Sequence, residues 1–232
     1  MVITNEVKQV PESRICLCLV HGFSPKGRDF FLTAQNLQVE KAGGEAGALY
    51  EAFKINAGMV SARVDRAPDS IGAALKIKEI IERTGAAKVV AAPSPLVDSL
   101  QLADLWAADT GPDLHLRDLR LHAPDAGVGI SAFDLAIVET GTLVQDATNL
   151  DCRLVSMLPP VHVALVPTDR IVPTLRDALE LYGRDLDGLP PYLAFVTGPS
   201  RTADIERVLT IGVHGPAELH IIFIDRPGGE AV

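Results

Sequence analysis

The sequence predicts an α/β fold with a mixed, largely parallel sheet flanked by helices, and three observations support this prediction. A strand pattern at residues 59–64, a helical pattern at 76–83 and a strand pattern at 88–92 form one βαβ unit. Between residues 142 and 166, strand candidates follow one another too closely for intervening helices, which indicates an antiparallel section. Residues 219–224 are almost continuously apolar, as in a strand buried on both faces.

The helix of the βαβ unit has start and stop signals as well as an apolar face. Pro68 and Asp69 are typical of a helix N-terminus, and Gly85 is typical of a helix end. Pro93 and Pro95 close the strand that follows. The apolar face of the helix holds Leu75, Ile77, Ile80 and Ile81.

The later elements follow from local periodicity and from helix-start residues. Pro173 and Ser200 each stand where a helix is expected to begin. The predicted helices are residues 96–107, 173–181 and 200–209, and the predicted strands are residues 113–118, 133–138, 142–146, 152–157, 161–166 and 192–196, with a loop at 185–191. Near the N-terminus, residues 14–20 have a strand pattern and residues 29–39 a helical pattern. The chain of 232 residues is long enough for one large domain, which we favour over two small ones.

Composition argues against several classes of protein. A formal net charge of −9 argues against binding to nucleic acid or to anionic membranes, since both need clustered Lys and Arg. The first residues lack the basic start and apolar centre of a secretory signal, and no apolar run approaches the ~20 residues of a membrane span. We therefore expect a cytoplasmic protein without nucleic-acid or membrane partners.

The cysteines of the chain, Cys16, Cys18 and Cys152, have no regular spacing, which favours a reduced cytosol over a disulfide framework. Cys16 and Cys18 followed by His21 offer three metal ligands, but their apolar neighbours favour two small core side chains in a strand. Cys152 has no adjacent base that would activate it as a nucleophile. The sequence therefore predicts no metal site.

Three apolar segments end in polar, glycine-rich turns, and we predict that these turns surround one pocket. The first turn is Glu139-Thr-Gly-Thr142, the second begins at Gly198, and the third is Gly212-Val-His-Gly-Pro216. In open α/β sheets, ligands sit outside the carboxyl ends of the strands. Residues 149–153 and 156–160 also precede predicted strands and are expected to line the same opening.

Glu139 is the candidate catalytic residue of the first turn. A carboxylate at a strand end can accept a proton, bind a hydroxyl group or attack an acyl group, depending on its pKa. The alternative is that Glu139 fixes the following turn through backbone N–H groups. Thr140, Gly141 and Thr142 are candidate ligand-binding residues, because a glycine between two hydroxyls allows a ligand to approach the backbone closely.

The second turn has the composition of an anion site. Ser200 at a helix N-cap would leave backbone N–H groups pointing outward, Arg201 offers a planar fork for carboxylate or phosphate, and Thr202 adds a hydroxyl. Together with Gly198, these are candidate ligand-binding residues. The alternative is an ordinary capped helix, and the spacing of a P-loop is missing.

His214 is the candidate catalytic residue of the third turn, since its imidazole can titrate or donate near neutral pH. Gly212 and Gly215, on either side of it, are candidate ligand-binding residues. His162 and His220 lie within apolar strands, where hydrogen-bonded core or edge positions are favoured over metal ligation.

Four motifs stand in order along the chain: Phe133-Asp-Leu-Ala-Ile-Val-Glu-Thr-Gly-Thr142, Ser156-Met-Leu-Pro-Pro-Val-His-Val163, Gly198-Pro-Ser-Arg-Thr-Ala-Asp-Ile-Glu206 and Gly212-Val-His-Gly-Pro216. Together they closely resemble the lactate utilization protein C family, whose members contain a LUD domain. The resemblance is strong over the C-terminal half and loose over the middle, and it begins at about Gln35. It therefore implies a LUD-type α/β domain at residues 35–232 behind a divergent N-terminal segment, residues 1–34.

The resemblance implies a fold similar to the sugar-isomerase, CoA-transferase and formyltetrahydrofolate cyclo-ligase group. It also implies a part in oxidising L-lactate to pyruvate beside iron–sulfur partner proteins, although this chain lacks cluster-binding cysteines of its own. In CoA transferases of the related fold a glutamate attacks the acyl group, and Glu139 is similar in placement. This last point is an analogy between folds.

We therefore weigh three functions. The leading hypothesis is a cytoplasmic component of lactate oxidation that binds a small anion or an unidentified cofactor through Arg201, the Ser200 helix start, Thr140 and Thr142. The alternative is a stand-alone acyl or CoA transferase, or a folate-type ligase, that uses Glu139 as nucleophile or base. The third is a regulatory ligand sensor without turnover.

Overall fold

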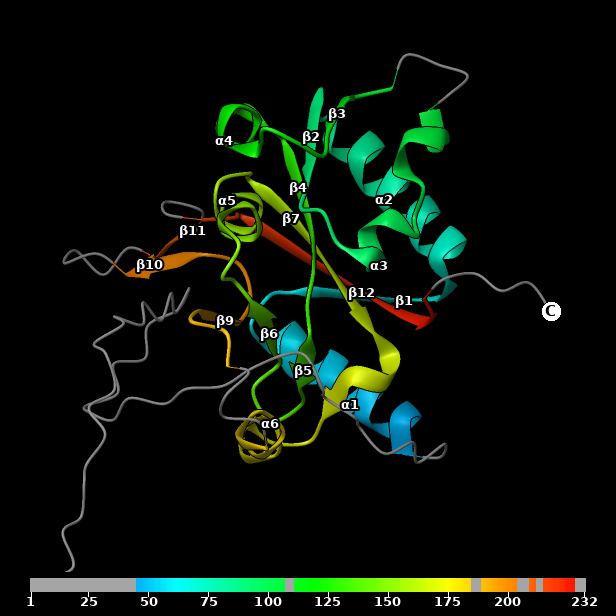
Figure 1. The fold of residues 1–232 in the computed structure, drawn as a ribbon. Coiled ribbons are helices and arrows are strands. Elements are labelled where there is room, and N and C mark those ends of the chain that lie inside the picture. The colour runs from blue at the N-terminus through cyan, green and yellow to red at the C-terminus, as the bar shows by residue number, and fades with distance from the viewer. Residues whose placement is uncertain (1–44, 107–110, 185–188, 204–208, 212–214, 228–232) are drawn as a thin grey trace, which may run out of the picture.

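The computed structural model describes residues 45–106, 111–184, 189–203, 209–211 and 215–227, whose elements are shown in Figure 1. These ranges contain a six-stranded sheet, a four-stranded sheet and a separate strand pair. No helix within them is both long and apolar enough to cross a membrane. The elements predicted at residues 14–20 and 29–39 lie outside the described ranges.

The larger sheet is entirely parallel and has the strand order β1-β12-β7-β4-β2-β3. Its strands are β1 (Arg63–Asp69), β2 (Lys88–Ala91), β3 (Asp113–His115), β4 (Val128–Ala132), β7 (Val161–Pro167) and β12 (Glu218–Arg226). The central strands β7 and β12 are buried along most of their length, because both faces of the sheet are covered. The expected continuous apolar strand near the C-terminus is thus confirmed.

Helices cover both faces of this sheet (Figure 1). On one face, α2 (Ser70–Thr84) and α3 (Pro95–Asp98) share a core that includes Ile77, Ile130 and Ile222. On the other face, α1 (Glu45–Met59) packs through Phe53 against Phe223. At the β2 and β4 side of this second face, α4 (Leu119–His122) and α5 (Leu150–Met157) form a separate apolar cluster.

The smaller sheet has the order β8-β5-β6-β9 and is largely antiparallel. Its strands are β5 (Leu135–Ile137), β6 (Thr142–Asp146), β8 (Ile171–Val172) and β9 (Leu193–Val196). Helix α6 (Leu175–Gly183) covers its outer face, where Tyr182 is fully buried. The remaining elements are the strand pair β10 (Arg201–Ala203) and β11 (Leu209–Ile211) and three 3-10 turns, η1 (Leu102–Trp106), η2 (Ala123–Asp125) and η3 (Thr168–Arg170).

The best-predicted elements are those with strong local end signals. The Asp69 side chain accepts a hydrogen bond from Gly72 N and caps α2, and Gly85 ends that helix with φ of 63°. Thr174 and Asp177 form a capping box at the start of α6. Strand β6 has the predicted bounds, and its antiparallel pairing with β5 and β9 confirms the antiparallel section.

Several predicted elements were wrong. Residues 152–157 belong to helix α5, because the Asn149 side chain accepts a hydrogen bond from Asp151 N and caps a helix there. The predicted helix at 200–209 has strands at its two ends, which pair antiparallel with Arg201 opposite Ile211. The predicted helix at 96–107 is interrupted at Gln101, which has φ of 48°. Helix α1 and strand β4 were not predicted.

The two strands and the helix of the βαβ unit were predicted correctly, but the two strands are not adjacent in the sheet. Strand β1 begins at Arg63, four residues later than predicted, and it is parallel to β2 in the same sheet. Three strands from later in the sequence, β12, β7 and β4, lie between β1 and β2. The sheet is therefore completed by its C-terminal strand, which places Glu218–Arg226 beside the first strand of the sheet.

Helix α5 approaches strand β4 as closely as a backbone allows. A Cβ atom on Gly129 of β4 would lie 2.1 Å from the Val155 carbonyl oxygen of α5 and 2.9 Å from Pro159 Cγ. Only a hydrogen atom fits in this position, because the nearest obstacle is backbone and not a flexible side chain. Gly129 therefore determines how deeply α5 sits on the sheet.

We expect Gly129→Ala to lower the free energy of unfolding by about 2 kcal/mol or more, because either α5 or β4 must shift. The matched control is Gly47→Ala on α1, where an added Cβ meets nothing within 4 Å. The control should be neutral or stabilising by about 0.5–1 kcal/mol. Denaturant unfolding of the purified variants measures both effects, and equal stability of the two would contradict the close approach.

Candidate functional site

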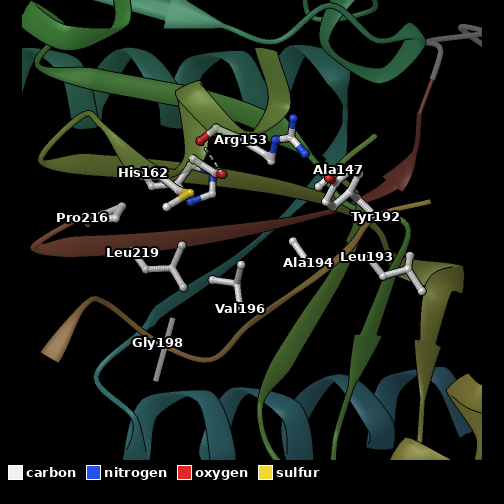
Figure 2. A pocket seen from close by; sticks show the side chains of 12 residues that line it. Ala147, Arg153, His162, Tyr192, Leu193, Ala194, Val196, Gly198, Pro216 and Leu219 are labelled. Carbon is white, nitrogen blue, oxygen red and sulfur yellow. Dashed lines mark hydrogen bonds between the residues drawn. The ribbon is translucent and has the colours of Figure 1, made fainter. Parts of the chain in front are cut away.

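A pocket of about 260 Å³ lies between the two sheets, beside the amino ends of β7 and β12 (Figure 2). Its walls come from α5, β7, β9, β12 and the loops next to them. Most of the lining is apolar, and the side chains with polar groups are Arg153, Ser156, His162 and Tyr192. The apolar part of the wall is Ala147, Met157, Leu193, Ala194, Val196, Pro216 and Leu219, together with Gly198.

Arg153 supplies the positive charge of the pocket. Its guanidinium lies over the ring of Tyr192, with Cζ 4.6 Å from the ring centroid, and this stacking holds the planar group in place. No carboxylate pairs with Arg153 in the part of the chain that the structure describes. Stacking engages the flat face of a guanidinium, so its N–H edge remains suited to a carboxylate or phosphate.

His162 supplies a buried imidazole to the same pocket. Its side chain is 1% exposed, and Nε2 lies 2.9 Å from the Ser131 hydroxyl of β4. Nδ1 has no hydrogen-bond partner among the described residues. Burial lowers the pKa of His162 to about 3, so the imidazole is neutral at ordinary pH.

Ser156 contributes a hydroxyl on the helix side of the pocket. Its Oγ donates to the Arg153 carbonyl oxygen at 3.2 Å, which ties two lining residues of α5 together. The hydroxyl oxygen can still accept a hydrogen bond. Residues 149–153 and 156–160 were expected to line an opening, and Arg153, Ser156 and Met157 do line the pocket.

Glu139 lies outside this pocket. Its side chain is exposed, and Oε2 accepts a hydrogen bond from Leu175 N in the first turn of α6 at 3.1 Å. Its backbone N–H donates to the Pro173 carbonyl oxygen at 3.0 Å. The carboxylate thus binds a backbone N–H group, but that group belongs to the first turn of α6 and not to the turn that follows Glu139, as the structural alternative had it.

The two threonines of the first turn connect to the chain segment beside the pocket through hydrogen bonds between hydroxyl groups. Thr142 Oγ1 lies 2.6 Å from Thr140 Oγ1 and 2.8 Å from Thr197 Oγ1, so one chain of hydroxyls joins β6 to the residue before Gly198. Gly141 has φ of 61°, and a Cβ there would lie 2.5 Å from Ala57 N. This glycine therefore allows close approach of helix α1, where a ligand had been expected.

The second and third turns meet at the pocket through backbone contacts. Gly198 lines the pocket with φ of 70°, and its missing Cβ leaves room for the Val60 carbonyl oxygen. The Ser200 N–H donates to the Pro216 carbonyl oxygen at 2.8 Å, which joins the two turns. Because Ser200 precedes strand β10 and not a helix, the expected anion site at a helix N-terminus is corrected.

Several predicted site residues cannot be placed at the pocket. Gly212 and His214 lie outside the described residues. The backbones of Arg201 and Thr202 belong to β10, and Gly215 precedes the pocket-lining Pro216. Among the predicted ligand-binding residues, Gly198 is therefore the one that the structure places in the pocket wall.

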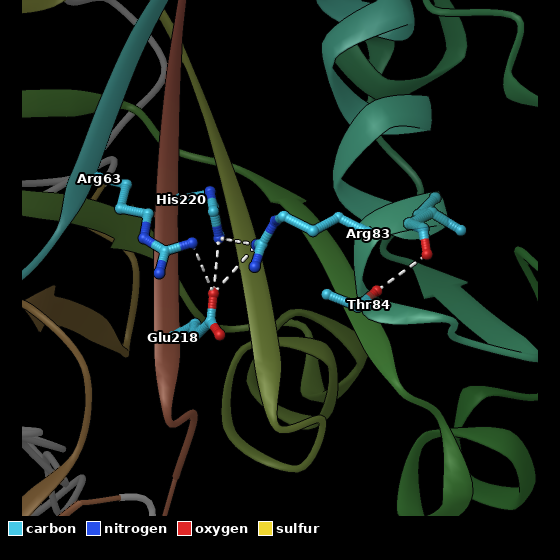
Figure 3. A network of polar contacts seen from close by, with 6 residues as sticks. Arg63, Arg83, Thr84, Glu218 and His220 are labelled. Atoms are coloured by element: carbon cyan, nitrogen blue, oxygen red, sulfur yellow. Dashed lines mark hydrogen bonds and ion pairs between the residues drawn. The ribbon is translucent and has the colours of Figure 1, made fainter.

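A second polar cluster lies on the other face of β12 (Figure 3). Glu218 Oε2 lies 3.0 Å from both Arg63 Nη1 and Arg83 Nη2, and His220 Nε2 lies 3.1 Å from the same oxygen. The neighbouring His220 and two Arg side chains lower the pKa of Glu218. This cluster ties β1, α2 and β12 together, and it confirms a hydrogen-bonded position for His220, which is 4% exposed.

The cysteine expectations are tested at one position. Burial raises the pKa of the Cys152 thiol to about 11, which disfavours the thiolate that a nucleophile requires. Cys16, Cys18 and His21 precede the first described residue. Within the described ranges, no three His, Cys, Asp or Glu side chains gather as metal ligands.

The two most important polar groups of the pocket were not predicted as binding residues. Arg153 was named only as part of a segment near the opening, and His162 was interpreted as a core histidine. The Asn149 cap was the signal that would have placed Arg153 and Ser156 on one helix. For His162 the sequence offers only a polar side chain in an apolar strand, which is usually structural.

The chain is thus a mixed α/β protein with a small, largely apolar pocket between two sheets. Residues 50–224 match the family model of the LUD domain, and the chain belongs to that family. The matched range contains every pocket-lining residue. It begins after residue 35, where the domain was expected to start.

Similar proteins carry the name lactate utilization protein C. The one from Geobacillus sp. (strain WCH70) is 32% identical over 164 residues, which cover 65% of this chain and 68% of the relative. The one from Macrococcus caseolyticus is 32% identical over 176 residues, with coverage of 70% and 71%. The Bacillus subtilis protein is 29% identical over 173 residues, with coverage of 67% and 70%. A crystal structure of a DUF162 family protein from Deinococcus radiodurans has a TM-score of 0.48 and 22% identity, covering 80% of this chain and 99% of the other.

The neutral state of His162 predicts a specific loss of stability in acid. The unfolded chain binds a proton at this histidine below about pH 6.5, whereas the folded protein does so only near its lowered pKa of about 3. Stability therefore decreases as the pH falls through this window. Between about pH 7 and pH 5 the wild type should lose on the order of 1–2 kcal/mol more than His162→Gln does. Denaturant unfolding across pH measures this difference, and parallel curves for the two proteins would contradict it.

Proposed function

We propose that this chain is a component of L-lactate utilization and binds a small carboxylate in the pocket between α5, β7 and β9. Membership of the LUD domain family and the likeness to lactate utilization protein C support the process. One observation supports a carboxylate as the ligand. Arg153 lies in the pocket wall, stacked on Tyr192, without a carboxylate partner among the described residues.

The walls of the pocket match a small acid in size and polarity. A pocket of about 260 Å³ is small for a nucleotide or a coenzyme and suits an acid of a few carbon atoms. Arg153 would pair with the carboxylate, and Met157, Val196 and Leu219 would contact its carbon atoms. A hydrogen bond to a charged group, such as this pair would form, is worth about 1.5–3 kcal/mol.

The oxidation of L-lactate to pyruvate releases two electrons, which must pass to an acceptor. We propose that iron–sulfur partner proteins provide this acceptor and that the chain acts beside them, as the family resemblance implies. Cys16, Cys18 and Cys152 do not have the spacing of a cluster-binding set. The role proposed for this chain is therefore to bind the acid or its product within an assembly.

The proposed likeness of the fold to the sugar-isomerase, CoA-transferase and formyltetrahydrofolate cyclo-ligase group rests on its mixed, largely parallel sheet flanked by helices.

A stand-alone transferase or ligase that uses Glu139 receives little support from the position of that residue. Its carboxylate is bonded to the first turn of α6, and it does not line the pocket. We therefore place the acid-binding role first.

The binding proposal is tested by titration calorimetry of the purified chain with L-lactate and with pyruvate. Arg153→Gln should weaken binding by about 10- to 100-fold, since it removes a charge-assisted pair from a largely apolar site. Arg176→Gln is the control, because Arg176 is 85% exposed on α6 and its loss changes the net charge equally. If Arg153→Gln binds both acids as tightly as the control, Arg153 does not hold the carboxylate.

The assembly proposal needs a separate experiment in the native host. The affinity-tagged chain should co-purify with proteins that contain iron and labile sulfide, and the purified assembly should reduce a dye when L-lactate is added. Arg153→Gln should still co-purify but should oxidise subsaturating L-lactate more slowly than the wild type and Arg176→Gln. Absence of iron–sulfur proteins from the wild-type preparation would refute the partnership and leave the pocket assignment standing.

A further inference from the structure

We propose that the pocket takes up a proton when it binds its carboxylate, and that Asp134, at the junction of the two sheets, holds this proton. The inference rests on the proposed function, because it assumes that the ligand is an anion held near Arg153. It goes further by assigning a role to an acid outside the pocket and by predicting how binding depends on pH. The proton comes from the solvent, and no covalent bond of the ligand changes.

Asp134 stands where the chain passes from the larger sheet to the smaller one. It lies between β4 and β5, and its backbone N–H donates to the Val144 carbonyl oxygen of β6 at 2.9 Å. Its carboxylate accepts a hydrogen bond from the Asp146 N–H at the end of β6. The side chain of Asp134 thus connects the link between the two sheets to the last residue of β6.

Backbone contacts continue from this acid to the cation of the pocket. Ala147 follows Asp146 and lines the pocket, and its N–H donates to the Tyr192 carbonyl oxygen at 3.0 Å. Figure 2 shows Ala147 and Tyr192 beside each other in the pocket wall. The Tyr192 ring in turn carries the Arg153 guanidinium. Asp134 is therefore close to the place where the carboxylate of a ligand is expected.

The charged and titratable groups around Asp134 come from four elements. Asp146 of β6 opposes its ionisation, and Arg170 of η3 favours it. Burial, and then the charges of Asp134 and Asp146, raise the pKa of Tyr182 on α6. Burial also raises the pKa of Cys152 on α5, and the same two acids add to this shift. The field of the two acids thus extends to the helix that supplies the cation of the pocket.

The charge of Asp134 changes near neutral pH. Burial, together with the Asp146 carboxylate, raises the pKa of Asp134 to about 6. An ionised acid repels an incoming carboxylate, whereas a protonated acid does not. Affinity for an anion is therefore higher below this pKa and lower above it. By linkage, a bound anion raises the pKa of Asp134, so binding near pH 6.5 takes up part of a proton.

Titration calorimetry of the full chain with pyruvate tests this pH dependence, since the pyruvate carboxylate is ionised at pH 5.5 and at pH 7.5. The wild type should bind pyruvate about 2- to 15-fold more tightly at pH 5.5. This range is the effect of a unit charge about 10 Å away at effective dielectric constants of about 80 to 20.

Two variants assign the effect to one acid. Asp134→Asn is uncharged and keeps an oxygen acceptor for the Asp146 N–H, so at pH 7.5 it should bind pyruvate as tightly as the wild type does at pH 5.5. Asp104→Asn is the control, because Asp104 is exposed on η1 and its loss changes the net charge equally. The control should keep the pH dependence of the wild type.

Proton uptake is measured at pH 6.5 from the binding heats in two buffers that differ in ionisation enthalpy. The wild type and Asp104→Asn should take up a fraction of a proton per pyruvate, and Asp134→Asn clearly less. In ¹³C NMR of the wild type, the Asp134 carboxyl resonance should titrate at a higher pH when pyruvate is bound. This readout needs no variant for the titration itself and is independent of any change in folding.

Equal affinity of the wild type for pyruvate at pH 5.5 and pH 7.5 would overturn the inference and leave the acid pocket intact. The same conclusion follows if Asp134→Asn keeps the pH dependence and proton uptake of the wild type, or if pyruvate does not move the titration of the Asp134 carboxyl. Binding of no pyruvate at either pH would overturn both the inference and the proposed pocket.

Discussion

The pocket depends on how closely helix α5 lies against strand β4. Gly129 makes this distance possible, because a Cβ at that position would enter the Val155 carbonyl of the helix. Gly129 is also the cross-strand partner of His162 on β7. The same glycine thus lets α5 bring Arg153 over the sheet at the level where the buried imidazole stands, and a helix displaced outward would separate the two groups. The absence of a side chain at Gly129 therefore allows the close packing of α5 and, through it, the position of Arg153 relative to His162.

The remaining polar contacts near the pocket hold backbone segments in place. The hydroxyls of Thr140, Thr142 and Thr197 connect the smaller sheet to the turn at Gly198, and the Ser200 N–H connects that turn to Pro216. These contacts explain why Gly198 and Pro216, which are far apart in sequence, line one cavity. The turns position the backbone walls, while a helix and a central strand supply the polar groups.

Local signals determined which elements the sequence could predict. Helices α2 and α6 have capping residues that act within a few positions, and β12 is so apolar that only a buried strand fits it. By contrast, residues 201–203 and 209–211 form strands because β10 and β11 pair with each other, a contact between segments that their helix-like composition does not reveal. Helix α5 was mistaken for a strand because its eight residues are too few to show a clear period.

The pocket lies away from the place where the sequence predicted a site, and the reason lies in the topology. Ligands sit at the carboxyl ends of strands in open, doubly wound sheets, and Glu139 was chosen on that basis. Here a second sheet packs across one face of the first, and its strand β9 encloses space beside the amino ends of β7 and β12. A histidine in such a strand is indistinguishable in sequence from a core residue. His162 differs from one because it lines a pocket and because its buried Nδ1 has no hydrogen-bond partner among the described residues. The pocket arises only when β7, β9 and α5 come together.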